Sequence, residues 1–334
     1  MTTKKGQIYL YGEQHHNEAM EKKQLELWYN HYHNDGMRHL FVEYPYYTAE
    51  FLNIWMKADD NEILDMLIDD LKLHSEAGEM GEDFANMVKF FEMLKAHLPE
   101  TVFHGTDIGH QYDMGQKFLQ HLRDNGLEGS EKYRIAQENI EQGVLYRDKL
   151  QANDSRRSEM MVQNFIREFD ALGGESVMSL FYGMEHVCFG NYPDSHGGGV
   201  TMASRLKERY GDNLHAVSLI DLMETVGTPE EVVIAGRPYT AQFFGKNNIG
   251  HGHPTIADIA FWRLDNAYDE FAGNAPTGDW LPYNNYPTPV KSRDVFVIAY
   301  TMKSGEIMRM YHRADEGAVY EGKPATVGFV VEEE

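Results

Sequence analysis

Apolar runs of strand character alternate with stretches of helical period through most of this chain. The run 8–11 leads into Gly12-Glu13-Gln14-His15, and the stretch 19–33 that follows has apolar residues at helical spacing. A second apolar run, 38–42, ends at Glu43. This part of the chain therefore predicts a strand, a tight glycine turn that presents a histidine, a helix, and a strand that ends in an acid.

The same order of elements occurs a second time. The apolar run 177–182 leads into Gly183-Met184-Glu185-His186, and the stretch 202–210 has helical period. The apolar run 214–220 follows and ends at Asp221. The chain therefore contains two related units, each with the order strand, G-x-x-H, helix and strand.

These repeated units predict an α/β fold with a mixed central sheet and helices on both of its faces. Ligands of open α/β sheets bind outside the carboxyl ends of the strands. Four side chains are predicted at those ends, namely His15, Glu43, His186 and Asp221.

The segments between and after the two units complete the expected fold. Residues 44–100 have the spacing of a helical insertion, and the short strand 101–105 leads to Asp107. Residues 228–290 are rich in Gly, Asn, Pro and Tyr, which indicates loops that cover the site, with one helical piece at 256–271. The runs 294–300 and 307–311 predict a C-terminal hairpin that adds strands to the sheet. No linker is evident, so residues 1–334 are expected to form a single domain.

Composition narrows the possible functions. The 334 residues carry a formal net charge of −23, which argues against nucleic-acid or anionic-membrane partners. One cysteine, Cys188, leaves no intramolecular disulfide, and no apolar run reaches the ~20 residues of a membrane span. A cytoplasmic protein is expected.

The residue types at the strand ends suit two kinds of chemistry. Two histidines and a carboxylate can hold a divalent ion such as Mn, Co or Zn, and the candidate ligands are His15, Glu43 and His186. A carboxylate-oriented histidine can instead activate water. An acid directly after an apolar strand, such as Glu43, needs a partner, because burial without one costs several kcal/mol.

Other signals are weaker and leave alternatives open. A thiol nucleophile at Cys188 is conceivable, although a buried small hydrophobe is the commoner role of a cysteine. Residues 197–199, Gly-Gly-Gly, lack the spacing of a phosphate-binding loop and indicate a flexible loop. Four residues are predicted to contact substrate, namely Tyr46 in the aromatic loop 44–47, Asp107, His251 and His253.

The motifs resemble those of a known clan. Gly12-Glu13-Gln14-His15 is similar to the G-E-x-H opening of ChaN-like and erythromycin esterase-like proteins, and both G-x-x-H motifs resemble those of the TraB/Tiki proteins. Glu43 follows in the expected order. Residues 157–164, Arg-Ser-Glu-Met-Met-Val-Gln-Asn, are similar to the R-D-x-x-M-A-x-N helix of the clan, with Ser158 in place of its aspartate.

The resemblance implies a cleft lined by both histidines, the glutamate and the arginine. Its members include esterases that open a lactone with histidine-activated water, metal-dependent peptidases and a haem-binding lipoprotein. The implied catalytic residues are His15 or the adjacent His16, with Glu43, Arg157 and His186. Gly183 stands where the esterases tend to carry another histidine.

Two hypotheses of function follow. The first is a hydrolase that cleaves an ester or amide of a small to medium substrate, a small molecule or a peptide. In it Glu43 orients one histidine of the pair His15-His16, which takes a proton from water, while Arg157 and His186 stabilise the oxyanion. The second is a protein that binds haem or another ligand without turnover. The absence of a lipoprotein signal at the first residues favours the hydrolase.

Overall fold

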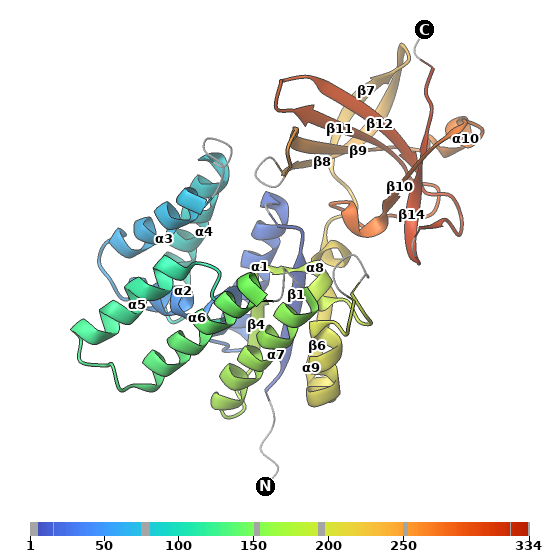
Figure 1. Ribbon diagram of the computed structural model, residues 1–334. Coiled ribbons are helices and arrows are strands. Elements are labelled where there is room, and N and C mark those ends of the chain that lie inside the picture. Colours follow the sequence, from blue (N-terminus) through green and yellow to red (C-terminus); the bar gives the residue numbers. More distant parts are fainter. Residues whose placement is uncertain are drawn as a thin grey trace. The chain divides into compact units, whose positions relative to one another are not determined.

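The protein consists of two compact units in the computed structural model (Figure 1). The structure describes residues 6–15, 17–74, 81–149, 154–192, 198–249, 253–320 and 322–332. The first unit comprises Met1–His15, Gln24–His74 and Phe84–Ser218, and the second comprises His16–Lys23, Ser75–Asp83 and Leu219–Glu334. Each unit has its own sheet, and no described strand of one sheet pairs with the other sheet.

The sheet of the first unit is parallel in every described pairing. Its strands are β1 (Ile8–Glu13), β2 (His39–Pro45), β3 (Val102–Asp107), β4 (Val177–Leu180), β5 (Tyr182–Gly183) and β6 (Leu214–Ser218). β4 and β5 continue one another and are separated by Phe181, whose φ of 64° lies in the left-handed region. The strands follow the order β3, β2, β4, β1, and β6 pairs with β1 on its other side.

This strand order places the two sequence repeats symmetrically. β4 lies between β1 and β2, and β1 lies between β4 and β6. A two-fold rotation about an axis between β1 and β4 would therefore exchange β1 with β4 and β2 with β6. The two crossovers run in opposite directions across the sheet, so right-handed connections place their helices on opposite faces. The expected α/β fold with helices on both faces is confirmed.

Nine helices occur in the described part of this region. They are α1 (Glu18–Asn34), α2 (Tyr46–Trp55), α3 (Glu62–His74), α4 (Gly81–His97), α5 (Tyr112–Asp124), α6 (Glu131–Lys149), α7 (Asp154–Ala171), α8 (Met184–Val187) and α9 (Met202–Tyr210). The insertion predicted at 44–100 is helical. The aromatic loop predicted at 44–47 is wrong, because α2 begins at Tyr46 with Pro45 at its N-cap and buries Tyr46 and Tyr47.

The second unit is an antiparallel sheet where loops were expected. Its strands are β7 (Thr228–Ile234), β8 (Arg237–Asn248), β9 (Ile256–Leu264), β10 (Pro276–Pro282), β11 (Val295–Met302), β12 (Ile307–Arg313), β13 (Val319–Tyr320) and β14 (Lys323–Phe329), with the short helix α10 (Tyr268–Phe271). The order is β10, β14, β12, β11, β9, β8, β7. The loop-rich cover predicted at 228–290 and its helical piece are therefore wrong.

Burial on both faces of this sheet explains the error. Leu264 of β9 belongs to one apolar cluster, against which Trp262 packs, whereas Phe261 belongs to another, against which Ile259 packs. A strand buried on both sides is apolar at consecutive positions, and its pattern is not distinguishable from that of a buried helix. The predicted hairpin is present as β11 and β12, but it belongs to this second sheet.

No helix in the ranges that the structure describes is long and apolar enough to cross a membrane.

The close approach of α8 to β1 leads to a test of the packing between the repeats. A Cβ added to Gly12 would lie 2.2 Å from Val187 Cγ2 and 2.9 Å from Met184 Cα. We expect Gly12→Ala to lower the free energy of unfolding by about 1–3 kcal/mol, the usual cost of overpacking, as measured by urea denaturation. Gly129→Ala is the control, because a Cβ there meets nothing within 4 Å. Equal stability of the two variants would contradict the close packing.

Candidate active site

The two G-x-x-H motifs lie side by side in the parallel sheet. β1 pairs with β5 in the register Gly12↔Tyr182 and Glu13↔Gly183. A Cβ on Gly183 would lie 3.0 Å from His15 Nε2 and 3.8 Å from His186 Cδ2. The two histidines therefore approach each other across Gly183, at the carboxyl ends of the strands, which is the edge that the repeat predicts.

Glu13 holds His15 in place. Its Oε1 lies 2.8 Å from His15 Nδ1, and its other carboxylate oxygen accepts a hydrogen bond from the side-chain amide of Gln24. Gln24 in turn accepts a 2.8 Å hydrogen bond from the backbone N–H of Phe181. The Glu13 side chain is only 4% exposed, whereas that of His15 is 51% exposed. The buried carboxylate thus fixes an imidazole that reaches solvent.

The pairing with Glu13 changes the protonation of His15. Burial by itself disfavours the charged imidazolium, but the hydrogen bond and the negative charge of Glu13 outweigh this and raise the pKa of His15 to about 9. At neutral pH the His15 side chain is therefore mainly cationic.

Arg157 of α7 joins the ends of two strands. Its Nη2 donates to Glu43 Oε1 at 2.6 Å and to Asp107 Oδ2 at 2.7 Å, and its Nε donates to Asp107 Oδ1 at 2.9 Å. The second oxygen of Glu43 accepts a 2.7 Å hydrogen bond from the Gly183 N–H. The expected partner of Glu43 is therefore the arginine, and Asp107 is part of the same cluster.

The charges of this cluster stabilise one another. Burial alone would raise the pKa of Glu43, but the charges of His186 and Arg157 lower it to about 2. Burial likewise opposes ionisation of Asp107, and the Arg157 guanidinium beside it brings the pKa of Asp107 well below its usual range. The pKa of Arg157 is raised, because its two carboxylates outweigh the cost of burial. All three groups are charged over the physiological range.

His186 makes contacts at both ring nitrogens. Its Nε2 lies 3.4 Å from Glu43 Oε1, and its Nδ1 lies 2.8 Å from the hydroxyl of Tyr192. That hydroxyl is also 3.0 Å from Ser158 Oγ, which explains why a small hydroxyl residue fits where the clan pattern has aspartate. Glu43 therefore contacts His186, and the acid beside His15 is Glu13. The sequence predicts that Glu43 orients one histidine of the pair His15-His16. His15 Nδ1 contacts Glu13 instead, and His16 lies outside the described residues.

Three further residues predicted at the site have local surroundings of their own in the structure. Tyr46 is buried in the core, where its ring packs edge-on against Phe118. Asp221 is exposed in a 3-10 turn after β6. His253 belongs to the second unit, where its Nδ1 accepts the N–H of Ile256. His16 and His251 lie outside the described residues.

The three suggested metal ligands have other partners in the structure. Within the described residues, no group of three or more His, Cys, Asp or Glu is placed to hold a metal ion. Both oxygens of Glu43 are engaged, one by Arg157 and the other by the Gly183 N–H, and His15 Nδ1 faces Glu13. A divalent ion at His15, Glu43 and His186 would compete with the Arg157 guanidinium.

Sequence reasoning missed several residues of the site. Glu13 ends β1, one glycine after its apolar run, so the burial argument applied to Glu43 could have identified it. His110, whose Nε2 lies 3.1 Å from Asp107 Oδ2, follows the strand-end acid by three residues. Gln24 and Tyr192 reach the site from a helix interior and a loop, and no local pattern marks them.

The ion pair between Glu43 and Arg157 leads to a prediction on stability. Glu43→Gln keeps the shape of the side chain but leaves Arg157 with a single carboxylate, so we expect a loss of about 3 kcal/mol in the free energy of unfolding. Because the folded-state pKa is lowered to about 2 from 4.5, the contribution is complete above pH ~4.5 and is lost as the pH falls through ~2.

Urea denaturation of wild type and Glu43→Gln at several pH values measures this difference. The difference in free energy of unfolding between wild type and Glu43→Gln should be constant above pH ~5 and should decrease in acid. Glu131→Gln is the control, since Glu131 forms only exposed pairs with Arg134. A gap that does not change with pH would contradict the charged pair.

Comparisons with known proteins complete this description. No protein-family model and no curated protein matches the chain. A mutant of the erythromycin esterase EreC in its open conformation is 14% identical, with a TM-score of 0.44 over 68% of this chain and 72% of that chain. A Bacillus cereus protein is 12% identical, with a TM-score of 0.44 over 78% of this chain and 77% of that chain. A succinoglycan biosynthesis protein is 10% identical, with a TM-score of 0.42 over 70% of each chain.

Proposed function

We propose that the protein is a hydrolase that cleaves an ester or amide bond with water activated by His15. The observation that carries the proposal is the buried Glu13 carboxylate on His15 Nδ1, which directs the other ring nitrogen toward Gly183. A histidine oriented by a carboxylate, beside a fixed guanidinium, is an arrangement suited to acyl transfer to water.

In the proposed reaction, the neutral His15 imidazole accepts a proton from water as the water oxygen attacks the substrate carbonyl. The resulting tetrahedral intermediate carries a negative charge on the former carbonyl oxygen. When the intermediate collapses, the bond to the leaving alcohol or amine breaks, and the imidazolium returns its proton to that leaving group. Glu13 stabilises the imidazolium throughout, as the acid of a catalytic triad does.

Arg157 is the proposed electrostatic partner of the oxyanion. Its Nε and Nη2 are used by Asp107 and Glu43, while its Nη1 makes no hydrogen bond to a residue of the described chain. The guanidinium is held rigidly by two acids, so its charge is oriented before the reaction begins. Glu43, Asp107 and His186 are then positioning residues that fix Arg157 and the Gly183 turn.

The raised pKa of His15 predicts the pH dependence of hydrolysis. With a pKa of about 9, the neutral base is roughly 1% of the protein at pH 7. The value of kcat/KM for an aryl ester should therefore rise about tenfold per pH unit from pH 7 and level off above pH ~9. Glu13→Gln removes the charge that raises the pKa of His15. The pH range over which kcat/KM rises should therefore move down, toward the ordinary histidine pKa near ~6.5.

A matched pair elsewhere in the chain provides the control. His31 Nδ1 also lies 2.8 Å from a carboxylate, that of Asp35, at the end of α1. Asp35→Asn should leave the pH profile unchanged, and His15→Asn should lower kcat/KM by roughly 10²- to 10⁴-fold. An unchanged pH dependence of kcat/KM in Glu13→Gln, or full activity in His15→Asn, would refute His15 as the base.

The metal alternative is tested on the same substrates. Because the cluster engages both oxygens of Glu43, we expect dialysis against a chelator to leave kcat/KM within about twofold of its original value. Loss of activity that is restored by Mn, Co or Zn would instead favour a metal-activated water.

A further inference from the structure

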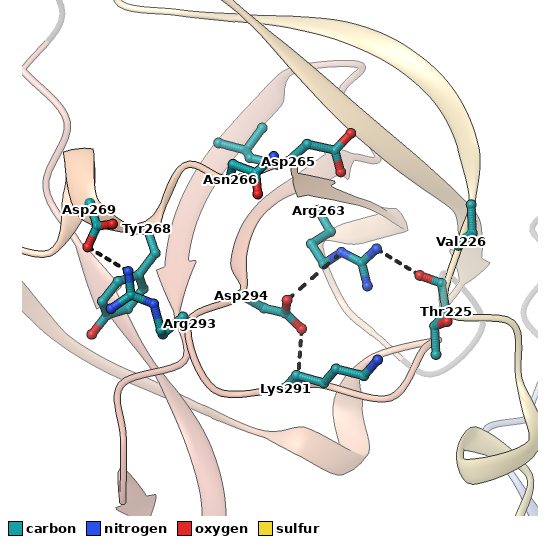
Figure 2. Close-up of a pocket in the computed structure, with 11 residues that line it drawn as sticks. Thr225, Val226, Arg263, Asp265, Asn266, Tyr268, Asp269, Lys291, Arg293 and Asp294 are labelled. Carbon is teal, nitrogen blue, oxygen red and sulfur yellow. Dashed lines mark hydrogen bonds and ion pairs between the residues drawn. The ribbon is translucent and has the colours of Figure 1, made fainter.

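We propose that the second compact unit carries a binding site for a neutral carbohydrate. The site is a polar pocket of about 460 Å³, lined by residues from the segments 225–226, 263–269 and 291–294 (Figure 2). This volume lies in the range of about 300–1,000 Å³ that small-molecule sites occupy. The three segments precede β7, end β9 and precede β11, so the pocket lies at the ends of sheet strands. The proposal does not depend on the hydrolase function.

Among the described residues, the Arg263 side chain donates a single hydrogen bond. Its Nη2 donates to the Thr225 carbonyl at 2.7 Å, and its guanidinium lies 5.3 Å from the centre of the Phe244 ring. Its Nε is 4.0 Å from Asp294 Oδ1, which is too long for a hydrogen bond. The side chain is nevertheless only 14% exposed. The Arg263 guanidinium is therefore held in place in the pocket, with N–H groups that no described residue accepts.

Asp294 is the matching acceptor. Its Oδ2 accepts the backbone N–H of Lys291 at 2.8 Å, and its Oδ1 makes no hydrogen bond to a described residue. Burial raises the pKa of this carboxyl group, against the lowering effect of that hydrogen bond. Figure 2 shows Arg263, Asp294 and Lys291 around the same opening. A ligand group between Arg263 and Asp294 would accept from one and donate to the other.

The charge of the lining indicates which ligand fits. The cations are Arg263, Lys291 and Arg293, and the anions are Asp265, Asp269 and Asp294. An ionic ligand would meet as many like charges as opposite ones. Hydroxyl groups both donate and accept, so vicinal hydroxyls of a sugar match a lining that carries both signs in equal number.

Two residues of the pocket have a strained backbone. Asn266 has a φ of 55° and Arg293 a φ of 74°, and only four non-glycine residues of the described chain have positive φ. The Arg293 guanidinium is fixed by a 2.6 Å hydrogen bond to Asp269 and lies 4.6 Å from the centre of the Tyr268 ring. Strain of this kind persists where the surroundings impose it, and it gathers at ligand sites.

Titration of the full chain with neutral sugars tests the proposal. The probes are glucose, galactose, mannose, maltose and lactose, followed by calorimetry and by saturation-transfer NMR. Glucuronate, glucosamine and glycine serve as anionic, cationic and zwitterionic comparisons. We expect at least one neutral sugar to bind at about 10 mM, where a site with a Kd of roughly 1 mM is nine-tenths occupied. The charged probes should bind more weakly.

Variants place the binding in this pocket. Lys291→Ala removes a side chain whose ammonium group has no partner among the described residues, and it should weaken sugar binding about tenfold without affecting folding. Asp294→Asn should weaken binding at least as much. Arg237→Ala is the control, because Arg237 pairs with Glu270 on the surface and does not line the pocket. The proposal fails if no neutral sugar binds, if a charged probe binds more tightly, or if Lys291→Ala leaves the affinity unchanged.

Discussion

The first unit depends on the need to neutralise three buried acids at one edge of a parallel sheet. Glu13, Glu43 and Asp107 end three different strands, and each is less than a tenth exposed. Burial of an unpaired carboxylate costs several kcal/mol, so the fold must supply a cation or hydrogen-bond donors to each. One arginine on α7 and one histidine after β1 meet this need, and their positions define the candidate site.

This constraint explains which residues of the buried cluster a local sequence pattern can indicate. A charged residue directly after an apolar strand is a local signal, and it identified Glu43 and Asp107. The two G-x-x-H motifs placed His15 and His186 at the same edge. The pairing of acids with bases depends instead on distances across the sheet. Local patterns could not show that Glu43 contacts His186, or that Glu13 is the acid beside His15.

The second unit shows a different limit of sequence reasoning. Strand β9 is buried on both faces, so it lacks the alternation that distinguishes a strand from a helix. Gly, Asn and Pro in residues 228–290 mark turns between strands, and their number suggested continuous loops. The hairpin at β11 and β12 was predictable because its turn at Gly305 and its apolar runs are local. Its membership in a separate sheet was not.

The adjacency of the two motif copies has a consequence for the history of the chain. Gly12 gives space to Val187 of the second copy, and Gly183 gives space to His15 of the first. In each copy a glycine without a side chain leaves room for a residue of the other copy, although the two copies are separated by about 170 residues. If the repeats descend from a duplicated half, the ancestral half would have needed a second identical chain to complete its edge. The fusion of both halves then allowed the two glycines to serve different neighbours, so that one copy packs a helix while the other accommodates an imidazole.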